Sequence, residues 1–294
     1  MNILVCIKQV PDTGTRIQLL KEGKGIDESG IEWIINPYDE FALEEALRIK
    51  ERIPNTRVQV LSLGPPRVEK ALRTALAMGA DKAVLIETPV SPSSSEEKPS
   101  LLNKNPALVA QALAQIISSQ KDFTSPEGLK KASFEEKKNP PAEKIKWDLI
   151  LTGKVGIDES HFATGPMLAE KLNIPHVGFV TKLQEKIKNI WLCERQGEEG
   201  IIEEITLHLP ALITVEKGLN EPRYPSLPGI MKAKKKELKK IKLSTLDIHY
   251  DKQMITFHSY QLPKESPPPR FISGSAEEQA KKLIHILKEK EKLI

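Results

Sequence analysis

The fold class is indicated most clearly by one stretch, Arg57-Val-Gln-Val-Leu-Ser-Leu-Gly-Pro-Pro-Arg-Val-Glu-Lys-Ala-Leu-Arg-Thr-Ala-Leu-Ala-Met-Gly-Ala-Asp-Lys-Ala-Val-Leu-Ile86. Its two ends, Arg57–Leu63 and Lys82–Ile86, are short apolar runs bounded by polar turns, as expected for buried strands. The middle has helical periodicity, with one apolar face made of Val68, Ala71, Leu72, Ala75 and Leu76. Gly79 follows that face, at the position where helices commonly end. We therefore predict a strand–helix–strand unit.

The same alternation extends to both sides of this unit. Ile3–Ile7 and Trp147–Thr152 are further strand-like runs, and Leu108–Ile117 has a helical pattern. Another helix is expected from Asn36-Pro37, with asparagine as the N-cap and proline in the first helical position. Its inward-facing residues would be Leu43, Ala46 and Leu47. Strands that alternate with helices imply right-handed crossovers, so we predict an α/β fold with an open, mostly parallel sheet and helices on both faces.

Two kinds of segment interrupt this pattern. Between Val180 and Val215, short strand-like runs surround two polar turns, which predicts antiparallel hairpins added to the parallel core. The stretches 89–104 and 118–146 are rich in Ser, Pro, Glu or Lys and lack sustained periodicity. We interpret both as exposed insertions in a domain that covers residues 1–243.

Residues 244–294 are predicted to form a C-terminal arm. The proline-rich run 266–270 is followed by Ser275 and Glu278, which form a capping box at the start of a helix. The helix has a single apolar stripe and cannot build a core alone, so we expect it to pack on a partner subunit.

The composition excludes several classes of protein. The 294 residues include 44 basic and 40 acidic side chains, a net charge of +4, so no overall field favours nucleic acid or an anionic membrane. Only Cys6 and Cys193 are present, without metal-ligand spacing, which predicts no metal site and favours a reducing compartment. The amino-terminal run resembles neither a signal peptide nor a transit peptide, so we expect a cytoplasmic protein.

The loop Gly153–Pro166 is the strongest candidate for a ligand site. It joins the strand-like run 147–152 to a helical run, and amides at Ala163–Gly165 together with the helix dipole are suited to hold a phosphate. An ordinary strand-to-helix turn explains the local pattern equally well. The two best-known glycine-rich phosphate-loop signatures are absent.

Other predicted strand ends would line the same crevice. Cys6 closes the first strand, residues 36–39 open the first helix, and Leu63 ends the second strand. Singly, these are core or capping residues, but together they could frame an adenosine. No catalytic triad or carboxylate pair stands out, and His161 beside Asp158 is more simply explained as a loop residue.

The segment Leu219–Lys236 combines a proline-rich loop with a lysine run. Pro222, Pro225 and Pro228 would stiffen a loop that presents Tyr224 and Leu227. Ile230 and Met231 would begin a short helix that carries Lys232, Lys234, Lys235 and Lys236. This combination suits an acidic protein partner, whereas composition alone favours a solvated basic helix.

Several segments together resemble the beta subunits of electron transfer flavoproteins. The matching residues occur in the family's order and include Val5–Lys8, Asn36–Ala46, Gly64-Pro65, Leu72–Asp81, Gly153-Lys154, Ile157-Asp158, Thr164-Gly165 and, most specifically, Leu219–Lys236. The resemblance implies a heterodimer whose alpha subunit holds the redox-active FAD, while the beta subunit binds AMP structurally. The protein would then be an electron carrier without substrate turnover of its own.

The resemblance also assigns site residues. The AMP pocket would comprise Cys6, Asn36, Pro37, Tyr38, Asp39, Leu63, Gly153, Lys154, Val155, Gly156, Ile157, Asp158, Glu159, Ser160, His161, Phe162, Ala163 and Thr164. Tyr38 would also approach the flavin ring. The partner-docking residues would be Arg223, Tyr224, Leu227, Pro228, Ile230, Met231, Lys232 and Lys235.

Leu227 would be the anchor for flavin dehydrogenases such as the acyl-CoA dehydrogenases of fatty acid oxidation. Electrons would then pass through FAD towards a membrane quinone oxidoreductase. A bifurcating branch of the family carries a second FAD instead of AMP and tends to have Asp-Gly-Asp-Thr in the nucleotide loop, where this chain has Asp158-Glu-Ser-His161. AMP is therefore favoured, and a second FAD or a nucleotide-binding regulatory protein of similar fold are the alternatives.

Overall fold

A computed structural model describes residues 1–23, 25–89, 105–119, 147–248, 259–264 and 267–293. Most of the two predicted insertions lies outside the described residues. The chain divides into two compact units, one formed by Met1–Ile17 and Glu28–Phe257, the other by Gln18–Asp27 and His258–Ile294. The two units are described separately.

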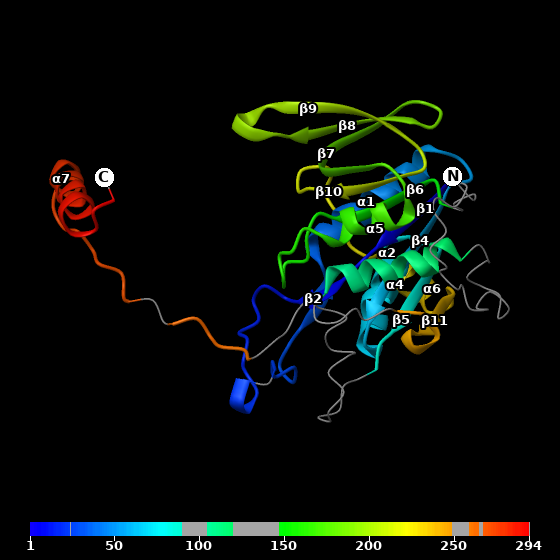
Figure 1. Ribbon diagram of the computed structural model, residues 1–294, viewed down its shortest axis with the longest axis horizontal. Helices are drawn as coiled ribbons and strands as arrows, with labels where there is room; N and C mark the ends of the chain where they lie inside the picture. The colour runs from blue at the N-terminus through cyan, green and yellow to red at the C-terminus, as the bar shows by residue number, and fades with distance from the viewer. Residues whose placement is uncertain (24, 90–104, 120–146, 249–258, 265–266, 294) are drawn as a thin grey trace. The chain divides into compact units, whose positions relative to one another are not determined.

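The larger unit is built on a nine-stranded sheet, which confirms the predicted α/β class (Figure 1). Its strands in chain order are β1 (Asn2–Cys6), β4 (Arg57–Gly64), β5 (Lys82–Glu87), β6 (Leu149–Gly153), β7 (His176–Ile187), β8 (Ile190–Gln196), β9 (Ile202–His208), β10 (Ala211–Val215) and β11 (Leu238–Lys242). Their order across the sheet is β11-β5-β4-β1-β6-β10-β7-β8-β9. A separate two-stranded sheet pairs β2 (Gln9–Pro11) with β3 (Trp33–Ile35).

Helices cover both faces of this sheet. The helices are α1 (Pro37–Arg52), α2 (Glu69–Met78), α4 (Pro106–Ser118), α5 (Thr164–Leu172) and the short α6 (Leu227–Ala233). Strand alternation assigns them to faces: Ile3 and Val5 share a core cluster with α1 and α2, whereas Leu4 and Cys6 share the other cluster with α4 and α5. The inward-facing residues predicted for the first two helices are buried.

The parallel part of the sheet is larger than the four strands predicted from sequence. β10 pairs in parallel with both β6 and β7. The prediction of antiparallel hairpins from Val180 to Val215 was therefore wrong for Ala211–Val215. Ala211–Val215 is completely buried because β10 returns from the hairpins into the space between β6 and β7. β11 also pairs in parallel with β5. Only its Ile241 is buried, and its lysines give it the polar pattern of a loop, so the sequence did not predict this strand.

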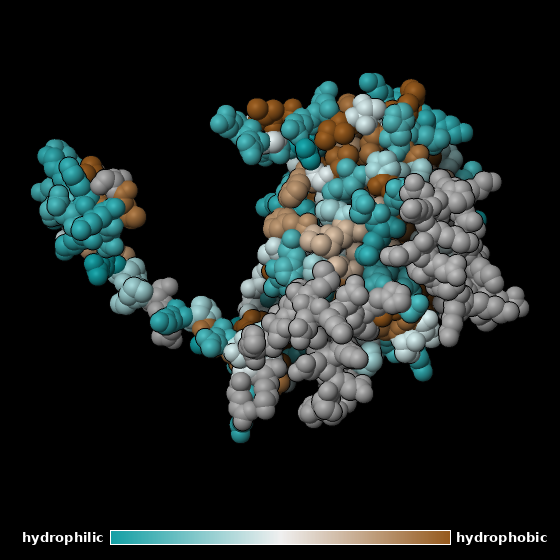
Figure 2. Space-filling view, in the orientation of Figure 1, coloured by the Kyte–Doolittle hydropathy of each residue, from teal (hydrophilic) through white to brown (hydrophobic). Residues whose placement is uncertain are grey.

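The predicted hairpins are confirmed in β7, β8 and β9, which pair antiparallel at the end of the sheet opposite β11 (Figure 1). Hydrophobic side chains gather over this end of the unit in Figure 2. Ile187, Ile201 and Ile202 are among its exposed apolar residues. Trp191 and Cys193 of β8 point to the opposite face of these strands from Ile187 and are buried.

The smaller unit contains α7 (Ala276–His285). Its predicted capping box is present: Ser275 Oγ accepts from the Glu278 amide at 3.4 Å, and the Glu278 carboxylate accepts from the Ser275 amide at 2.9 Å. Leu283 and Ile284 of its apolar stripe are exposed. Within the same unit Tyr260 N donates to Gly23 O at 2.9 Å. In the part of the chain that the structure describes, no helix has the length and apolarity needed to cross a bilayer.

Candidate functional site

The two central strands β1 and β6 lie side by side in parallel, and the chain leaves them towards opposite faces of the sheet. After β1 it reaches α1 on one face, and after β6 it reaches α5 on the other. Such a divergence leaves a crevice outside the carboxyl ends of the strands, where ligands of open α/β sheets bind. The predicted residues from Cys6, the start of α1 and the loop after β6 converge there.

Asp39 joins the carboxyl ends of the two strands. Its Oδ2 accepts from Lys8 N at 2.7 Å, and its Oδ1 accepts from Gly153 N at 2.8 Å. The side chain is buried, and burial raises the pKa of Asp39 to about 7 in spite of the hydrogen bonds that favour its charged form. Asp39 therefore holds the first turn of α1 against both strands.

Gly153 is required by this close packing. A Cβ at Gly153 would lie 2.5 Å from Asp39 Oδ1 and 2.6 Å from Tyr38 Cβ, which is too close for any side chain. The first turn of α1 can therefore approach the end of β6 only where the residue is glycine.

Asn36 occupies the N-cap position of α1 as predicted, but its side chain does not cap the helix. Its Nδ2 donates to Val155 O at 2.8 Å, and its Oδ1 accepts from Ile157 N at 3.2 Å. The amide group matches one acceptor and one donor of the loop, which explains why it turns away from its own helix. Asn36 thereby fixes the first part of the loop that follows β6.

The second part of this loop presents a series of backbone amides. Ser160 N closes a turn onto Gly156 O at 2.9 Å, and Ser160 and Phe162 both adopt left-handed backbone conformations, each with φ of 54°. Among the described residues, no acceptor receives the amides of residues 161–165, which lead into α5. Consecutive unpaired amides at a helix N-terminus provide a site for an anion.

Lys8 was missed by the sequence analysis as a site residue. Its Nζ lies 2.8 Å from the Asp158 carboxylate and 3.1 Å from Glu159 Oε2, so it ties the turn of the loop to the end of β1. Two signals in the sequence point to it: its position directly after an apolar strand and its place in the family-matching segment Val5–Lys8. His161 Nδ1 lies 3.7 Å from Glu159 Oε2 and the imidazole is exposed, as expected for a loop residue.

Lys154 lies among three aromatic rings at the edge of the crevice. Its Nζ is 4.9 Å from the centroid of the Tyr38 ring and 5.7 Å from each of the Phe162 and Phe179 rings, and it forms an ion pair with Glu216. Phe162 and Phe179 stack with centroids 5.9 Å apart. The sequence analysis missed Phe179 and Glu216, because only the pairing of β7 and β10 brings them to this edge.

Cys6 and Leu63 lie on the face of the sheet that α4 and α5 cover. Cys6 is buried, and burial, together with the nearby Asp39 carboxylate, raises the pKa of its thiol far above the ordinary value. The thiol is therefore neutral and unsuited to act as a nucleophile. Leu63 is partly buried and packs against the core cluster that contains Cys6.

The docking segment Leu219–Lys236 differs from the prediction in its helix. α6 begins at Leu227 rather than at Ile230, because Ser226 Oγ accepts from Gly229 N and Pro228 occupies the first turn. Of the four lysines only Lys232 lies within the helix. The predicted short helix is therefore present and carries Lys232, but Lys234, Lys235 and Lys236 follow its last residue.

The side chains of this segment fall into two groups. Tyr224 is 93% exposed, Leu227 80% and Met231 72%, and Ile230, Pro228, Lys232 and Lys235 are also exposed. Arg223 instead turns inward to the carboxylates of Glu44 and Glu51.

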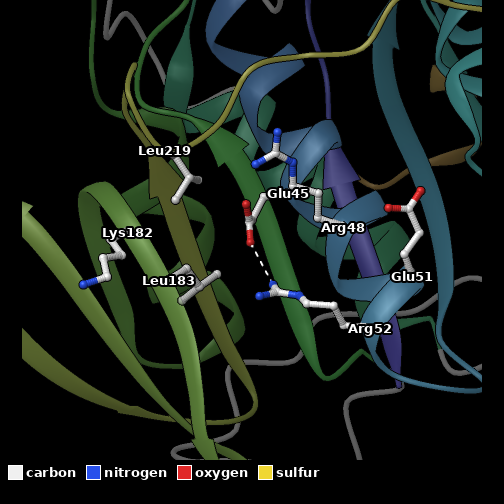
Figure 3. A pocket seen from close by; sticks show the side chains of 7 residues that line it. All are labelled: Glu45, Arg48, Glu51, Arg52, Lys182, Leu183 and Leu219. Atoms are coloured by element: carbon white, nitrogen blue, oxygen red, sulfur yellow. Dashed lines mark hydrogen bonds and ion pairs between the residues drawn. The ribbon is translucent and has the colours of Figure 1, made fainter.

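A separate pocket lies beside α1, lined by Glu45, Arg48, Glu51, Arg52, Lys182, Leu183 and Leu219 (Figure 3). Its cations are already paired: Arg52 with Glu45 at 3.2 Å, Lys182 with Glu194 at 2.5 Å, and Arg48 with Glu44 at 2.9 Å. The pocket therefore has no surplus charge to attract an anionic ligand, and the crevice remains the better candidate for a nucleotide site.

The fold and the crevice define a doubly wound α/β protein whose crevice lies at the switch point of its sheet. The electron transfer flavoprotein domain matches residues 24–123 and 141–246. The electron transfer flavoprotein subunit beta of Bacillus subtilis is 37% identical over 297 residues, covering 100% of both chains. The human protein of the same name is 33% identical over 98% of this chain and 97% of its own length. The chain belongs to the electron transfer flavoprotein beta subunits, and electron transfer is its function at that level.

Proposed function

We propose that this beta subunit forms a heterodimer with an electron transfer flavoprotein alpha subunit, binds AMP structurally, and docks flavin dehydrogenases in the cytoplasm. FAD held mainly by the alpha subunit would accept electrons from the dehydrogenase and deliver them to a membrane quinone oxidoreductase. The chain itself would turn over no substrate. The observation that carries this proposal is the combination of a crevice edged by backbone amides that have no acceptor among the described residues with an exposed leucine at the start of α6.

The crevice supports a nucleoside monophosphate. The amides of residues 161–165 would hold the phosphate, and the apolar side chains of Cys6 and Leu63 would suit an adenine or ribose. The carboxylates of Asp158 and Glu159 lie in the preceding turn and share the single cation of Lys8, so this turn keeps one net negative charge, which would disfavour a second phosphate. This charge arrangement favours AMP over the pyrophosphate of a second FAD, the bifurcating alternative.

Surfaces for the flavin and the alpha subunit are proposed at two places. Tyr38 lies at the edge of the crevice under Lys154, where it would approach the flavin ring. The C-terminal arm, residues 244–294, would pack on the alpha subunit through the apolar stripe of α7, where Leu283 and Ile284 are exposed. Exposed apolar stripes of this kind are stabilised when a partner covers them.

Release and identification of the bound nucleotide would test the proposal. The chain is produced together with its alpha subunit, the purified complex is denatured, and the released compounds are separated and quantified. One AMP and one FAD for each heterodimer is the expected result. Two FAD molecules would identify the bifurcating type, and ATP with no flavin would instead indicate a regulatory nucleotide-binding protein.

Leu227→Ala tests the docking role of the exposed leucine. Buried apolar anchors dominate small interfaces, so we expect the second-order rate of flavin reduction by an acyl-CoA dehydrogenase to fall roughly 10- to 100-fold. The FAD and AMP contents should not change, because Leu227 lies outside the crevice. Ile187→Ala, which truncates an exposed apolar residue of the β7–β8 hairpin, is the matched control. Equal rates for both variants would refute the anchor role.

A further inference from the structure

The backbone around Leu227 is held from two sides although its side chains are exposed. We infer that Arg223 and Glu44 are positioning residues, which fix the docking segment on α1 so that Leu227 is preorganised before a dehydrogenase binds. The inference rests on the proposed docking function and adds to it the residues that hold the anchor in place.

Arg223 forms a two-pronged contact with Glu44. Its Nε lies 2.7 Å from Glu44 Oε2, its Nη2 lies 3.0 Å from Glu44 Oε1, and its backbone amide also donates to Oε2 at 3.3 Å. Nη1 donates at 2.6 Å to Oε1 of Glu51, which follows Glu44 by about two helical turns in α1. A planar guanidinium held by two carboxylates has little freedom to rotate.

Glu44 is suited to this role because its side chain is only 3% exposed. Burial alone would raise the pKa of Glu44, but hydrogen bonds from Arg223 and Arg48 hold it below its ordinary value. The carboxylate is therefore charged in the folded protein and depends on arginine partners. Removing Arg223 would leave a buried charge with Arg48 as its remaining partner.

Asn220 adds a second attachment to α1. Its Nδ2 donates to Phe41 O at 3.0 Å and to Glu45 Oε2 at 3.1 Å, and the residue is 9% exposed. Arg48 Nη2 also donates to Glu221 O at 3.4 Å. In Figure 3, Leu219 lies across the pocket from Arg48 and Arg52, at the point where the segment approaches α1. The chain is thus held by α1 from Asn220 to Arg223.

The carboxyl end of α2 holds the other side of α6. A Cβ at Gly229 would lie 2.3 Å from Ala77 O, so the two backbones are in direct contact. Arg73 Nη1 donates to Ala233 O and to Lys236 O, each at 2.9 Å. Lys236 Nζ donates to Leu76 O at 2.9 Å and to Ala80 O at 2.6 Å, where it satisfies carbonyls at the end of α2.

Leu227 therefore lies between two fixed points, Arg223 on α1 and Gly229 on α2. A partner that binds Leu227 would not have to order its backbone, and a smaller ordering cost leaves more of the interaction energy for binding. The ion pairs of Arg223 with the buried Glu44 and with Glu51 would thus position the anchor from behind.

Hydrogen exchange tests this inference on the purified heterodimer without any dehydrogenase. In Arg223→Gln, exchange of the backbone amides of residues 221–230 should become at least 10-fold faster, while exchange of β1 and β6 amides should not change. Arg223→Lys keeps the charge opposite Glu44 but not the two-pronged contact, so it should accelerate the same amides to a smaller extent. Arg195→Gln, which removes an exposed ion pair with Glu203 on the β8–β9 hairpin, is the control.

Docking is then measured with an acyl-CoA dehydrogenase that reduces the wild-type heterodimer. We expect the KM for Arg223→Gln and Arg223→Lys to rise about fivefold or more with kcat and FAD content unchanged. Unchanged exchange in both variants would overturn the inference, as would faster exchange with an unchanged KM. If Leu227→Ala also leaves the rate unchanged, the proposed docking function fails; if it slows reduction, that function stands and only the positioning role is lost.

Discussion

The crevice and the docking segment are both supported by α1, but their side chains point in opposite directions. The crevice gathers residues from the ends of β1 and β6 and from the first turn of α1, and its side chains are largely turned inward to hold backbone amides in place. The docking segment is continuous from Leu219 to Lys236 and turns its apolar side chains outward. Where the backbone would contact the ligand, buried polar side chains hold that backbone from within the crevice. Where an exposed side chain would contact the partner, the supporting polar side chains lie on the opposite side of the segment.

α1 serves both regions with different residues. Asn36 and Asp39 at its start support the crevice, and Glu44, Glu45 and Glu51 further along support the docking segment. Substitutions can therefore disturb one region without the other, at Gly153 and Asp39 for the crevice and at Lys232 and Lys235 for the docking segment.

Gly153→Ala should damage the crevice most. The added Cβ would collide with Asp39 and with the Tyr38 backbone, so the first turn of α1 must move away from β6. We expect a loss of about 3 kcal/mol in the free energy of unfolding, together with loss of the bound nucleotide. Denaturant unfolding and nucleotide content would measure both effects.

Gly30→Ala is the control for this substitution, because a Cβ at Gly30 would meet no atom within 4 Å. A Gly153→Ala protein that unfolds at the wild-type denaturant concentration and keeps its nucleotide would contradict the close packing described here.

Asp39→Asn should change how stability depends on pH. The pKa of Asp39 is raised from 3.8 to about 7 in the folded state, so the folded protein binds the proton more tightly than the unfolded chain. Its contribution to stability is therefore complete below pH 3.8 and is lost as the pH rises through about 7. Relative to Asp39→Asn, wild-type stability should fall by roughly 2 kcal/mol between pH 5 and pH 8.

The measurement is denaturant unfolding of both proteins at several pH values, since other titrating groups cancel in the difference between them. A difference that stays constant from pH 5 to pH 8 would show that Asp39 titrates normally.

Lys232→Gln combined with Lys235→Gln should have the smallest effect. Both lysines are exposed beside Leu227, so they should speed encounter with an acidic partner rather than strengthen the complex. We expect the association rate with the dehydrogenase to fall severalfold at low salt and to converge with the wild-type rate at high salt. Lys171→Gln, on α5 outside the docking segment, controls for loss of charge; the same decrease in that variant would exclude a local role.

Local patterns predicted most of the architecture. Apolar runs and helix termini located β1, β4, β5, β6 and four of the helices, because burial and capping depend on neighbouring residues. β11 was missed because three of its five residues are lysines, and its pairing with β5 depends on a segment more than 150 residues away. The parallel placement of β10 was missed for a related reason, because an apolar run predicts a buried strand but not the strands with which it pairs.

For the candidate sites, sequence patterns were enough to locate the loop after β6 and the docking segment, because each is one continuous stretch with its own turns and helix start. The residues that support them became apparent from the tertiary structure alone. The side chain of Asn36 bonds to a loop 119 residues away, Lys8 pairs with a turn 150 residues away, and Arg223 reaches a glutamate 179 residues before it. These contacts are set by the parallel order of the strands and the packing of α1, because hydrogen bonds and ion pairs depend on positions within a few ångströms that no local pattern specifies.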